Sequence, residues 1–304
     1  MTDTPTCAGF VALIGEPNAG KSTLLNALVG AKLSIVTHKV QTTRFRIRGV
    51  LNENASQIVF VDTPGLFAPK RTLDRAMVAA AWAGASDSDV VMLLIEAHRG
   101  LTKGVQRILD DLDKHLGPDT PVALVINKID RVKRETLLAL TTEIKEKRDF
   151  EEVFFISATR QNGLEAMTEW LEGKMPEGPW LYPEDQLGDA SMRAIAAEVT
   201  REKLMLRLHQ ELPYQMTVET EAWEERKDGS VKIDQAVIVA KEGHRPIILG
   251  KGGQTLKQIG QASREELSDM MERKVHLFLR VKVDERWQED RARYSEMGLE
   301  FPEG

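Results

Sequence analysis

A glycine-rich loop of the form G-x-x-x-x-G-K-S constrains the fold of this chain more than any other feature. The loop covers residues 15–22; it follows the apolar run 10–14 and leads into a helical pattern over 21–29. A strand that passes through glycines into a helix brings backbone N–H groups to the helix N-terminus, where the helix dipole favours anions. The loop therefore predicts a nucleoside triphosphate site within an α/β sheet.

Further apolar runs repeat this pattern along the first half of the chain, and amphipathic stretches separate them. Continuous apolar strands that alternate with helices are typical of a mostly parallel sheet with helices on both faces. Ligands of such sheets bind at the carboxyl ends of the strands, and Asp62, Asn127 and Ser157 follow three of the runs directly. The runs are 58–61, 90–95, 121–126 and 153–156, and the helical stretches lie near 73–86, 104–116, 134–148 and 163–174.

The second half of the chain has a different pattern, which predicts a separate α+β domain. A segment with three prolines, 176–188, is interpreted as a linker. The order after it is helix, two strands, helix, turn, helix and strand, which is that of a type II KH fold. We therefore predict four parts: a nucleotide-binding domain at 1–175, the linker at 176–188, a KH domain at 189–283 and a C-terminal extension at 284–304.

Charge is distributed unevenly, which bears on the partners of the second domain. The whole chain has a net charge of −6, but residues 241–282 contain nine basic and five acidic residues. A local positive patch of this kind attracts phosphates. Cys7 is the only cysteine, so neither an internal disulfide nor a thiolate metal site is expected. The N-terminus lacks the basic and long apolar regions of a signal or membrane segment, and we expect a cytosolic protein.

Side chains in and after the glycine loop are suited to phosphate and Mg²⁺. We expect Lys21 to bridge the β- and γ-phosphates and Ser22 to ligate Mg²⁺. Asp62 would hold the same ion through water, and the N–H of Gly65 would contact the γ-phosphate. Thr43 lies in a polar stretch after the first helix and is the threonine that we expect to bind Mg²⁺ when the triphosphate is present. Lys21, Thr43 and Gly65 are thus the predicted catalytic residues.

The string N-K-x-D at Asn127, Lys128 and Asp130 predicts the base. A carboxylate at Asp130 can accept from both N1–H and the 2-amino group of guanine, a donor pair that adenine lacks. Ser157 and Ala158 follow the next strand, where a backbone N–H can meet the guanine O6. The predicted GTP or GDP contacts are Gly15, Glu16, Pro17, Asn18, Ala19, Gly20, Lys21, Ser22, Thr23, Asp62, Thr63, Pro64, Gly65, Leu66, Asn127, Lys128, Asp130, Ser157 and Ala158.

A G-x-x-G turn at residues 250–253 predicts a clamp for single-stranded nucleic acid. In a KH domain such a turn presents backbone N–H groups to the sugar-phosphate chain, and side chains at the glycines would block the approach. An apolar run precedes the turn and an amphipathic helix follows it. The predicted RNA-binding residues are Arg245, Ile247, Ile248, Gly250, Lys251, Gly252, Gly253, Lys257 and Arg280.

These motifs, in this order and spacing, resemble the translation-factor-type small GTPases of the Era/TrmE branch. With the Pro-rich segment and the G-x-x-G turn, residues 8–283 look like the Era family, whereas the last twenty or so residues resemble it less. The resemblance implies a GTPase that binds the 3′ end of 16S rRNA and assists assembly of the 30S subunit, coupled to cell growth. It also implies a monomer with peripheral contact at the inner membrane.

Leu66 stands where Ras-like switches have a water-orienting glutamine, so we expect slow intrinsic hydrolysis, about 10⁻⁴–10⁻³ s⁻¹. The resemblance further implies that Asn18 ligates K⁺, while a loop-stabilising role for this side chain stays equally open. One rival interpretation is a constitutive RNA-binding assembly protein whose nucleotide site is structural. A TrmE-like tRNA-modification enzyme would need an additional partner domain, and a tandem GTPase would need a second phosphate loop; neither is found in the sequence.

Overall fold

A computed structural model describes residues 5–302 and divides the chain into two compact units. The first unit contains residues up to Ser34, Val40–Asp189 and residues from Ser295 onward. The second contains Ile35–Lys39 and Ala190–Tyr294. The fold class predicted from the sequence, an α/β domain followed by an α+β domain, is confirmed.

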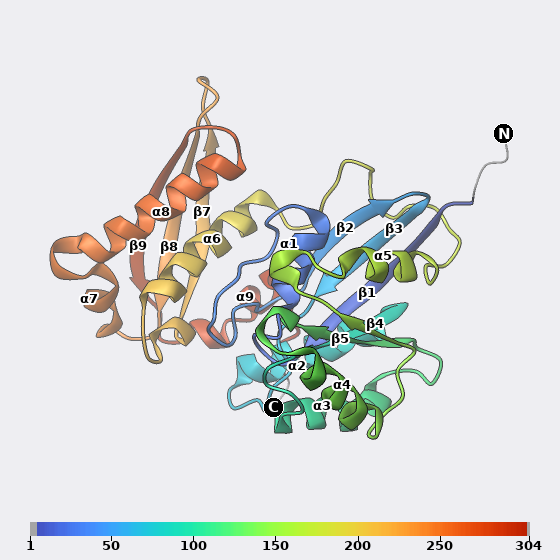
Figure 1. Ribbon diagram of the computed structural model, residues 1–304. Helices are drawn as coiled ribbons and strands as arrows, with labels where there is room; N and C mark the ends of the chain where they lie inside the picture. Colours follow the sequence, from blue (N-terminus) through green and yellow to red (C-terminus); the bar gives the residue numbers. More distant parts are fainter. Residues whose placement is uncertain (1–4, 303–304) are drawn as a thin grey trace. The chain divides into compact units, whose positions relative to one another are not determined.

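The first unit is built on a six-stranded sheet with the order β2-β3-β1-β4-β5-β6 (Figure 1). Strands β1, β3, β4, β5 and β6 pair in parallel, and β2 pairs antiparallel with β3. β3, β4 and β5 are buried along their whole length, which explains why they lack polar alternation. The strands are β1 Cys7–Gly15, β2 Ile47–Glu53, β3 Ser56–Asp62, β4 Val90–Glu96, β5 Val122–Asn127 and β6 Glu152–Phe155.

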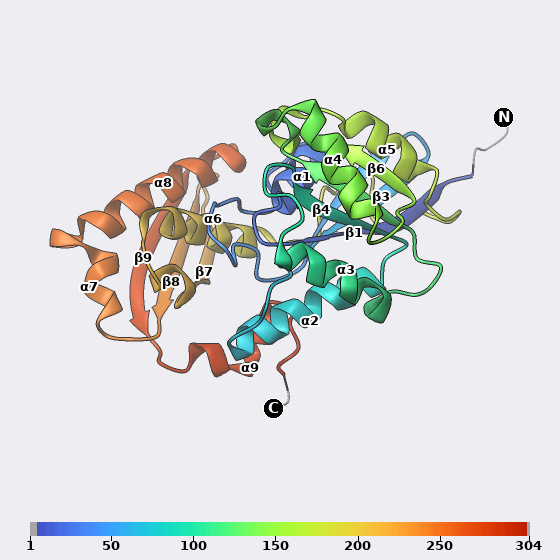
Figure 2. The ribbon, with the colours of Figure 1, turned by 60° about the horizontal axis from the view of Figure 1, so that its bottom comes forward.

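Helices cover both faces of this sheet, as the alternating pattern predicts (Figure 2). α1 and α5 pack on one face, where Leu24, Leu25 and Met167 join one core cluster. α2, α3 and α4 pack on the other face through residues such as Trp82 and Leu112. The helices are α1 Lys21–Val29, α2 Thr72–Ser86, α3 Lys103–His115, α4 Arg134–Lys145 and α5 Leu164–Glu172.

The Pro-rich segment lies against the first unit rather than forming a free tether. The amide side chain of Gln57 accepts from the backbone N–H groups of Leu181 and Tyr182 at 2.7 and 2.8 Å. Farther along, the N–H of Val50 donates to the carbonyl of Leu187 at 2.9 Å. The segment is therefore fastened along the edge strand β2 and its neighbour β3. The division into four parts made in the sequence analysis stays a prediction next to this division into two units.

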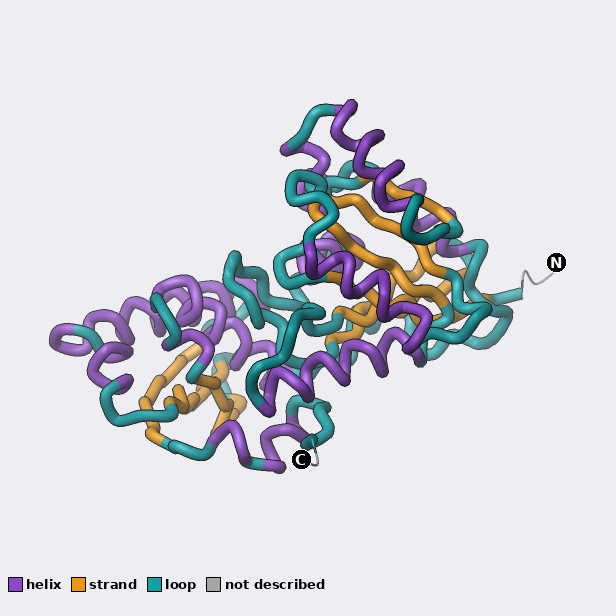
Figure 3. Tube along the Cα trace, turned by 90° about the horizontal axis from the view of Figure 1, so that it is seen from below, coloured by secondary structure: helices purple, strands orange, loops and turns teal. Residues whose placement is uncertain are grey.

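The second unit has a three-stranded sheet, β7-β8-β9, with helices on one face (Figure 3). β7 and β8 are antiparallel and β8 and β9 are parallel. α6 and α8 bury Leu204 and Ile259 against Val237, so they form the core with the sheet. The elements are α6 Met192–Arg207, β7 Met216–Glu225, β8 Val231–Val239, α7 His244–Leu249, α8 Gln254–Met270 and β9 Val275–Val283.

Two elements were not predicted. β2 has a mixed apolar and polar sequence with a glycine, so its residues do not show a clear strand pattern. The strand pairs along its whole length with β3. The extension contains α9, Arg291–Glu296, in which Tyr294 is buried like the nearby Trp287. Short 3₁₀ helices occur at Ile129–Arg131, Ala158–Arg160, Leu212–Tyr214, Lys251–Gly253 and Trp287–Glu289. Over residues 5–302, no helix is both long and apolar enough to span a bilayer.

Candidate functional site

The glycine loop connects β1 to α1 and encloses the Lys21 ammonium group. Lys21 Nζ donates to the carbonyls of Gly15 and Glu16 at 3.2 and 3.1 Å. Burial lowers the pKa of Lys21 to about 8, although the carboxylates of Asp62 and Glu16 oppose this shift. A buried ammonium that donates to neutral carbonyls is a strong attractor for phosphate oxygens.

Asp62 lies at the centre of a cluster of hydroxyl groups at the end of β3. Its Oδ2 accepts from Ser22 Oγ at 2.6 Å and from Ser34 Oγ at 2.8 Å, and Ser22 Oγ lies 2.9 Å from Thr43 Oγ1. Within the described part of the chain, the buried Asp62 Oδ1 has no hydrogen-bond partner, and burial raises the pKa of this carboxyl. Oxygen donors grouped in this way, with one buried oxygen still to be satisfied, suit a hard cation such as Mg²⁺.

Gly65 brings the loop after β3 against the phosphate loop. A Cβ atom at this position would lie 2.8 Å from the Cα, N and Cγ atoms of Pro17, so only glycine allows the approach. The next N–H, that of Leu66, donates to the Gly15 carbonyl at 2.9 Å. The Leu66 side chain is 3% exposed and packs in the core with α2 and α3. It therefore cannot orient a water molecule.

Asn127 ties the phosphate loop to the predicted base site. Its Nδ2 donates to the carbonyl of Ala19 at 2.9 Å, while Oδ1 accepts from the N–H of Ala158 at 3.1 Å. A Cβ at Gly20 would lie 2.2 Å from this Nδ2, and Gly20 has a φ of 101°. Asn127 thus sets the spacing between the two loops, and glycine at position 20 is required for it.

Lys128 and Asp130 take different positions in the base-binding segment. Lys128 Nζ donates to the Asn18 carbonyl and to Glu96 Oε2, both at 2.7 Å. Asp130 Oδ1 accepts from Ser157 Oγ at 2.7 Å, and this hydrogen bond holds the pKa of Asp130 below its usual range. An ionised carboxylate at this point would be able to accept from the two guanine donors.

Sequence reasoning missed the network around Glu16 of the phosphate loop. Glu16 Oε2 accepts from Thr102 Oγ1 at 2.7 Å, and Thr102 is also the N-cap of α3. A Cβ at Gly104 would lie 1.8 Å from Glu16 Oε1, so glycine there makes room for the carboxylate. The N-cap pattern at Thr102 is visible in the sequence, but nothing in it indicates the partner eighty-six residues away.

The structure places the other predicted nucleotide residues around the same loops. Thr63 Oγ1 donates to the carbonyl of Leu13 at 2.7 Å, which fixes the start of the loop after β3. Asn18 adopts a left-handed conformation with a φ of 69°. Pro17 and Ala19 belong to the phosphate loop, Thr23 to the first turn of α1 and Pro64 to the loop after β3.

The G-x-x-G turn leads from α7 into α8 of the second unit. Gly250, Gly252 and Gly253 have φ angles of 71°, 60° and 76°, a region that other residues rarely adopt. A Cβ at Gly252 or Gly253 would meet no atom of residues 5–302 within 4 Å, so this side of the turn is open. Lys251 is exposed beside it, and so are Arg245 and Lys257 on the two adjoining helices.

The apolar and strand residues predicted for RNA binding do not all lie together. Ile247 is 57% exposed, whereas Ile248 is fully buried in the core. Arg280 pairs with Glu221 of β7 on the face of the sheet opposite to α6 and α8, because Leu279 and Val281 take the core side of β9. Ile247 and the basic residues next to the turn are therefore exposed there, whereas Arg280 lies on another surface of the domain.

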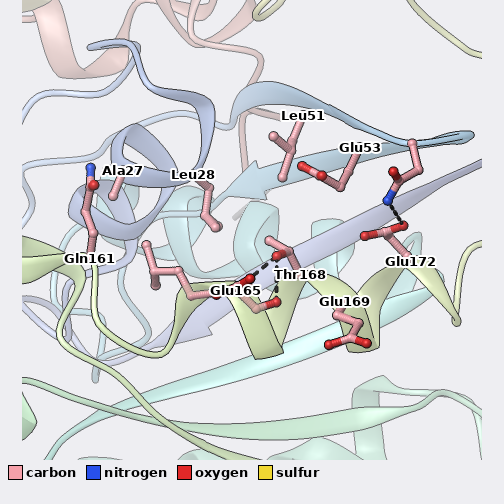
Figure 4. Close-up of a pocket in the computed structure, with 11 residues that line it drawn as sticks. Ala27, Leu28, Leu51, Glu53, Gln161, Glu165, Thr168, Glu169 and Glu172 are labelled. Atoms are coloured by element: carbon pink, nitrogen blue, oxygen red, sulfur yellow. Dashed lines mark hydrogen bonds between the residues drawn. The ribbon is translucent and has the colours of Figure 1, made fainter.

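A pocket on the first unit has the wrong charge for phosphate. It lies between α1, β2 and α5 and is lined by four glutamates, and Asn54 donates to one of them, Glu172, at 2.9 Å (Figure 4). Its carboxylates repel phosphate groups. The acidic residues are Glu53, Glu165, Glu169 and Glu172.

Comparisons with known proteins agree with this geometry. The family model described as 50S ribosome-binding GTPase matches residues 10–128, and the KH domain model matches residues 211–288. The chain is 64% identical to GTPase Era of Dinoroseobacter shibae over 300 residues, covering 99% of this chain and 97% of that protein. It is 55% identical to GTPase Era of Caulobacter vibrioides over 314 residues, covering 99% of both.

Two solved structures match nearly the whole chain with TM-scores of 0.90, and each comparison covers 96% of this chain and 99% of the other. One is a variant of Aquifex aeolicus Era bound to GDP·AlF4⁻, at 37% identity. The other is Era in complex with MgGDPNP and nucleotides 1506–1542 of 16S ribosomal RNA, at 36% identity.

The phosphate loop, the base-binding segment and the G-x-x-G turn define a P-loop GTPase that carries a KH domain. Within that class, the chain belongs to the Era family of GTPases.

Proposed function

We propose that this protein is a GTP-hydrolysing switch that binds the 3′ end of 16S rRNA through its KH domain and assists assembly of the 30S subunit, coupled to cell growth. The observation that carries the proposal is the open glycine turn in the same chain as a phosphate loop and the N-K-x-D segment that ends at Asp130. The proposal extends to a monomer that acts in the cytoplasm and makes peripheral contact with the inner membrane.

The hydrolytic reaction is attack of water on the γ-phosphate in line with the leaving oxygen. Lys21 would turn from the carbonyls of Gly15 and Glu16 to the β- and γ-oxygens, where its charge stabilises the transition state. Ser22, Thr43 and, through water, Asp62 would hold Mg²⁺, which supplies neutralising charge at the phosphates. The Gly65 N–H would donate to the γ-phosphate. Since Leu66 is buried, the water lacks a glutamine partner and we expect slow turnover.

Binding of a short single-stranded RNA with the sequence of the 3′ end of 16S rRNA tests the proposal. Fluorescence anisotropy with a non-hydrolysable GTP analogue and then with GDP is expected to give tighter binding in the first state. Equal binding in both states would favour the rival, a constitutive RNA-binding assembly protein. Absence of binding in both states would refute the rRNA assignment.

A monovalent ion adds a separate prediction for the phosphate loop. If Asn18 ligates K⁺ near the β/γ bridge, hydrolysis is expected to be about tenfold or more faster in KCl than in NaCl, because the ion adds positive charge where negative charge develops. The Asn18→Ala variant should lose this difference and keep its affinity for GDP. Equal rates of wild-type turnover in the two salts would leave Asn18 with a loop-stabilising role only.

A further inference from the structure

The segment Ile35–Lys39 separates from its sequence neighbours and groups with the second unit. Residues on either side of it, up to Ser34 and from Val40, belong to the first unit. The segment also lies between Ser34, which donates to Asp62, and Thr43, which lies against Ser22. A short stretch of chain that begins and ends at the nucleotide site is therefore held by the other unit.

Within the second unit, this segment is attached to α6 by both backbone and side chain. The N–H of Val36 donates to Glu202 Oε1 at 2.9 Å. Lys39 Nζ donates to the carbonyls of Met205 and Leu208. Glu202 is 3% exposed, so the acceptor of this hydrogen bond is buried.

The lysine contact occupies a position where a helix needs a cation. The last carbonyls of α6 have no partner within the helix, and the dipole places partial negative charge on them. Lys39 therefore caps α6, which ends at Arg207, from a distant part of the sequence. Burial lowers the pKa of Lys39, so the ammonium group has lost part of its hydration. A partly desolvated cation held by two carbonyls is costly to detach.

Both ends of the stretch contact residues of the predicted nucleotide site. Ser34 Oγ donates to Asp62 Oδ2 at 2.8 Å, and Thr43 Oγ1 lies 2.9 Å from Ser22 Oγ. Asp62, Ser22 and Thr43 are the residues that would hold Mg²⁺ with the triphosphate. Ser22 and Thr43 would give their oxygens to that cation, and Asp62 would hold it through water, so we expect the contact between Ser22 and Thr43 to rearrange when the cation binds.

We propose that Lys39 and Glu202 are positioning residues that couple occupancy of the nucleotide site to RNA binding by the KH domain, through the attachment of residues 35–39 to α6. This inference rests on the proposed function and names the contacts that would connect the nucleotide site to the KH domain. Coupling requires a differential contact between two states. We assign that role to the hydrogen bonds between residues 35–39 and α6, because α6 packs directly against α8, the helix that follows the G-x-x-G turn.

The test compares RNA affinity in the presence of a GTP analogue and of GDP, and expresses the coupling as the ratio of the two. Lys39→Met keeps the length of the side chain and removes its charge and donors; Glu202→Gln weakens the acceptor for Val36. Lys227→Met and Glu224→Gln are matched controls, because they change the same kinds of charge at exposed positions of the same unit. Hydrogen exchange at residues 35–39 gives a second readout.

Each single variant is expected to bring the ratio to within about twofold of one, against the 5- to 150-fold typical of coupled sites. The double variant should lose no more than the single variants, because the two residues act on one segment. Exchange at 35–39 should become independent of the nucleotide, and the controls should behave as wild type.

Two contrary results are distinguishable. A wild-type ratio above one that Lys39→Met and Glu202→Gln leave intact would overturn the inference and leave the proposed switch standing. A wild-type ratio of one would overturn the proposed coupling itself, and the role assigned to Lys39 with it.

Discussion

Replacing Asp130 with asparagine is expected to lower the affinity for GTP by about 10²–10⁴-fold, because two hydrogen bonds to a charged acceptor contribute about 1.5–3 kcal/mol each. Xanthine carries an oxygen where guanine carries the 2-amino group. The amide of Asp130→Asn can donate to that oxygen, so xanthosine triphosphate should become the preferred nucleotide. Titration of both nucleotides against wild type and variant measures the exchange of specificity.

Folding should be unaffected by this change, which makes the binding result interpretable. Asp130 is exposed, and an asparagine oxygen can still accept from Ser157. The thermal midpoint should therefore match that of wild type in the absence of nucleotide. If Asp130→Asn still preferred GTP over xanthosine triphosphate, Asp130 would not be the residue that recognises the base.

Gly65→Ala is expected to lower GTP turnover by about 10²–10³-fold, the usual effect of losing one donor to the transferring group. The added Cβ would lie 2.8 Å from backbone and ring atoms of Pro17, so the loop after β3 must withdraw from the phosphate loop. Its N–H then cannot reach the γ-phosphate. Single-turnover hydrolysis measures the loss, and GDP affinity should change little because GDP has no γ-phosphate.

A glycine elsewhere in the same unit provides the control. At Gly173 a Cβ would meet its nearest atom, the carbonyl oxygen of Trp170, at 3.5 Å, which is an ordinary contact. Gly173→Ala should therefore hydrolyse GTP at the wild-type rate. Turnover of Gly65→Ala within about threefold of wild type would contradict the assigned role of the Gly65 N–H, since one donor is worth far more.

The sequence predicts most of the fold because its strands are either fully buried or clearly amphipathic. β4 is apolar throughout, and α3 has a strong amphipathic pattern, so their positions follow from local rules. β2 is not predicted, because its sequence lacks a strand pattern and it is held in the sheet by pairing with β3. The buried Trp287 and Tyr294 of the extension were missed because an acidic terminus resembles solvated chain.

The residues of the nucleotide site can be predicted because each motif lies within a single loop at the end of a single strand. The motifs do not indicate which distant residues form hydrogen bonds with them. These pairs are Ser34 with Asp62, Glu96 with Lys128 and Thr102 with Glu16. These depend on tertiary packing, which no local pattern encodes. The position of Arg280 could not be predicted for the same reason. Alternation along a strand assigns a side chain to one face of the sheet only when the core side is known, and Arg280 lies on the face opposite to the core.

The fastening of residues 176–188 has a consequence for solubility. β2 forms one border of the six-stranded sheet, and an uncovered border offers unpaired N–H and C=O groups to any other chain. Leu187 accepts from Val50, and Gly188 forms a bridge with Gly49, so the segment occupies part of that border. A fragment that stopped before residue 176 would present it to neighbouring copies. The residues between the two domains thus also cover part of a sheet border that could otherwise pair with another copy of the chain.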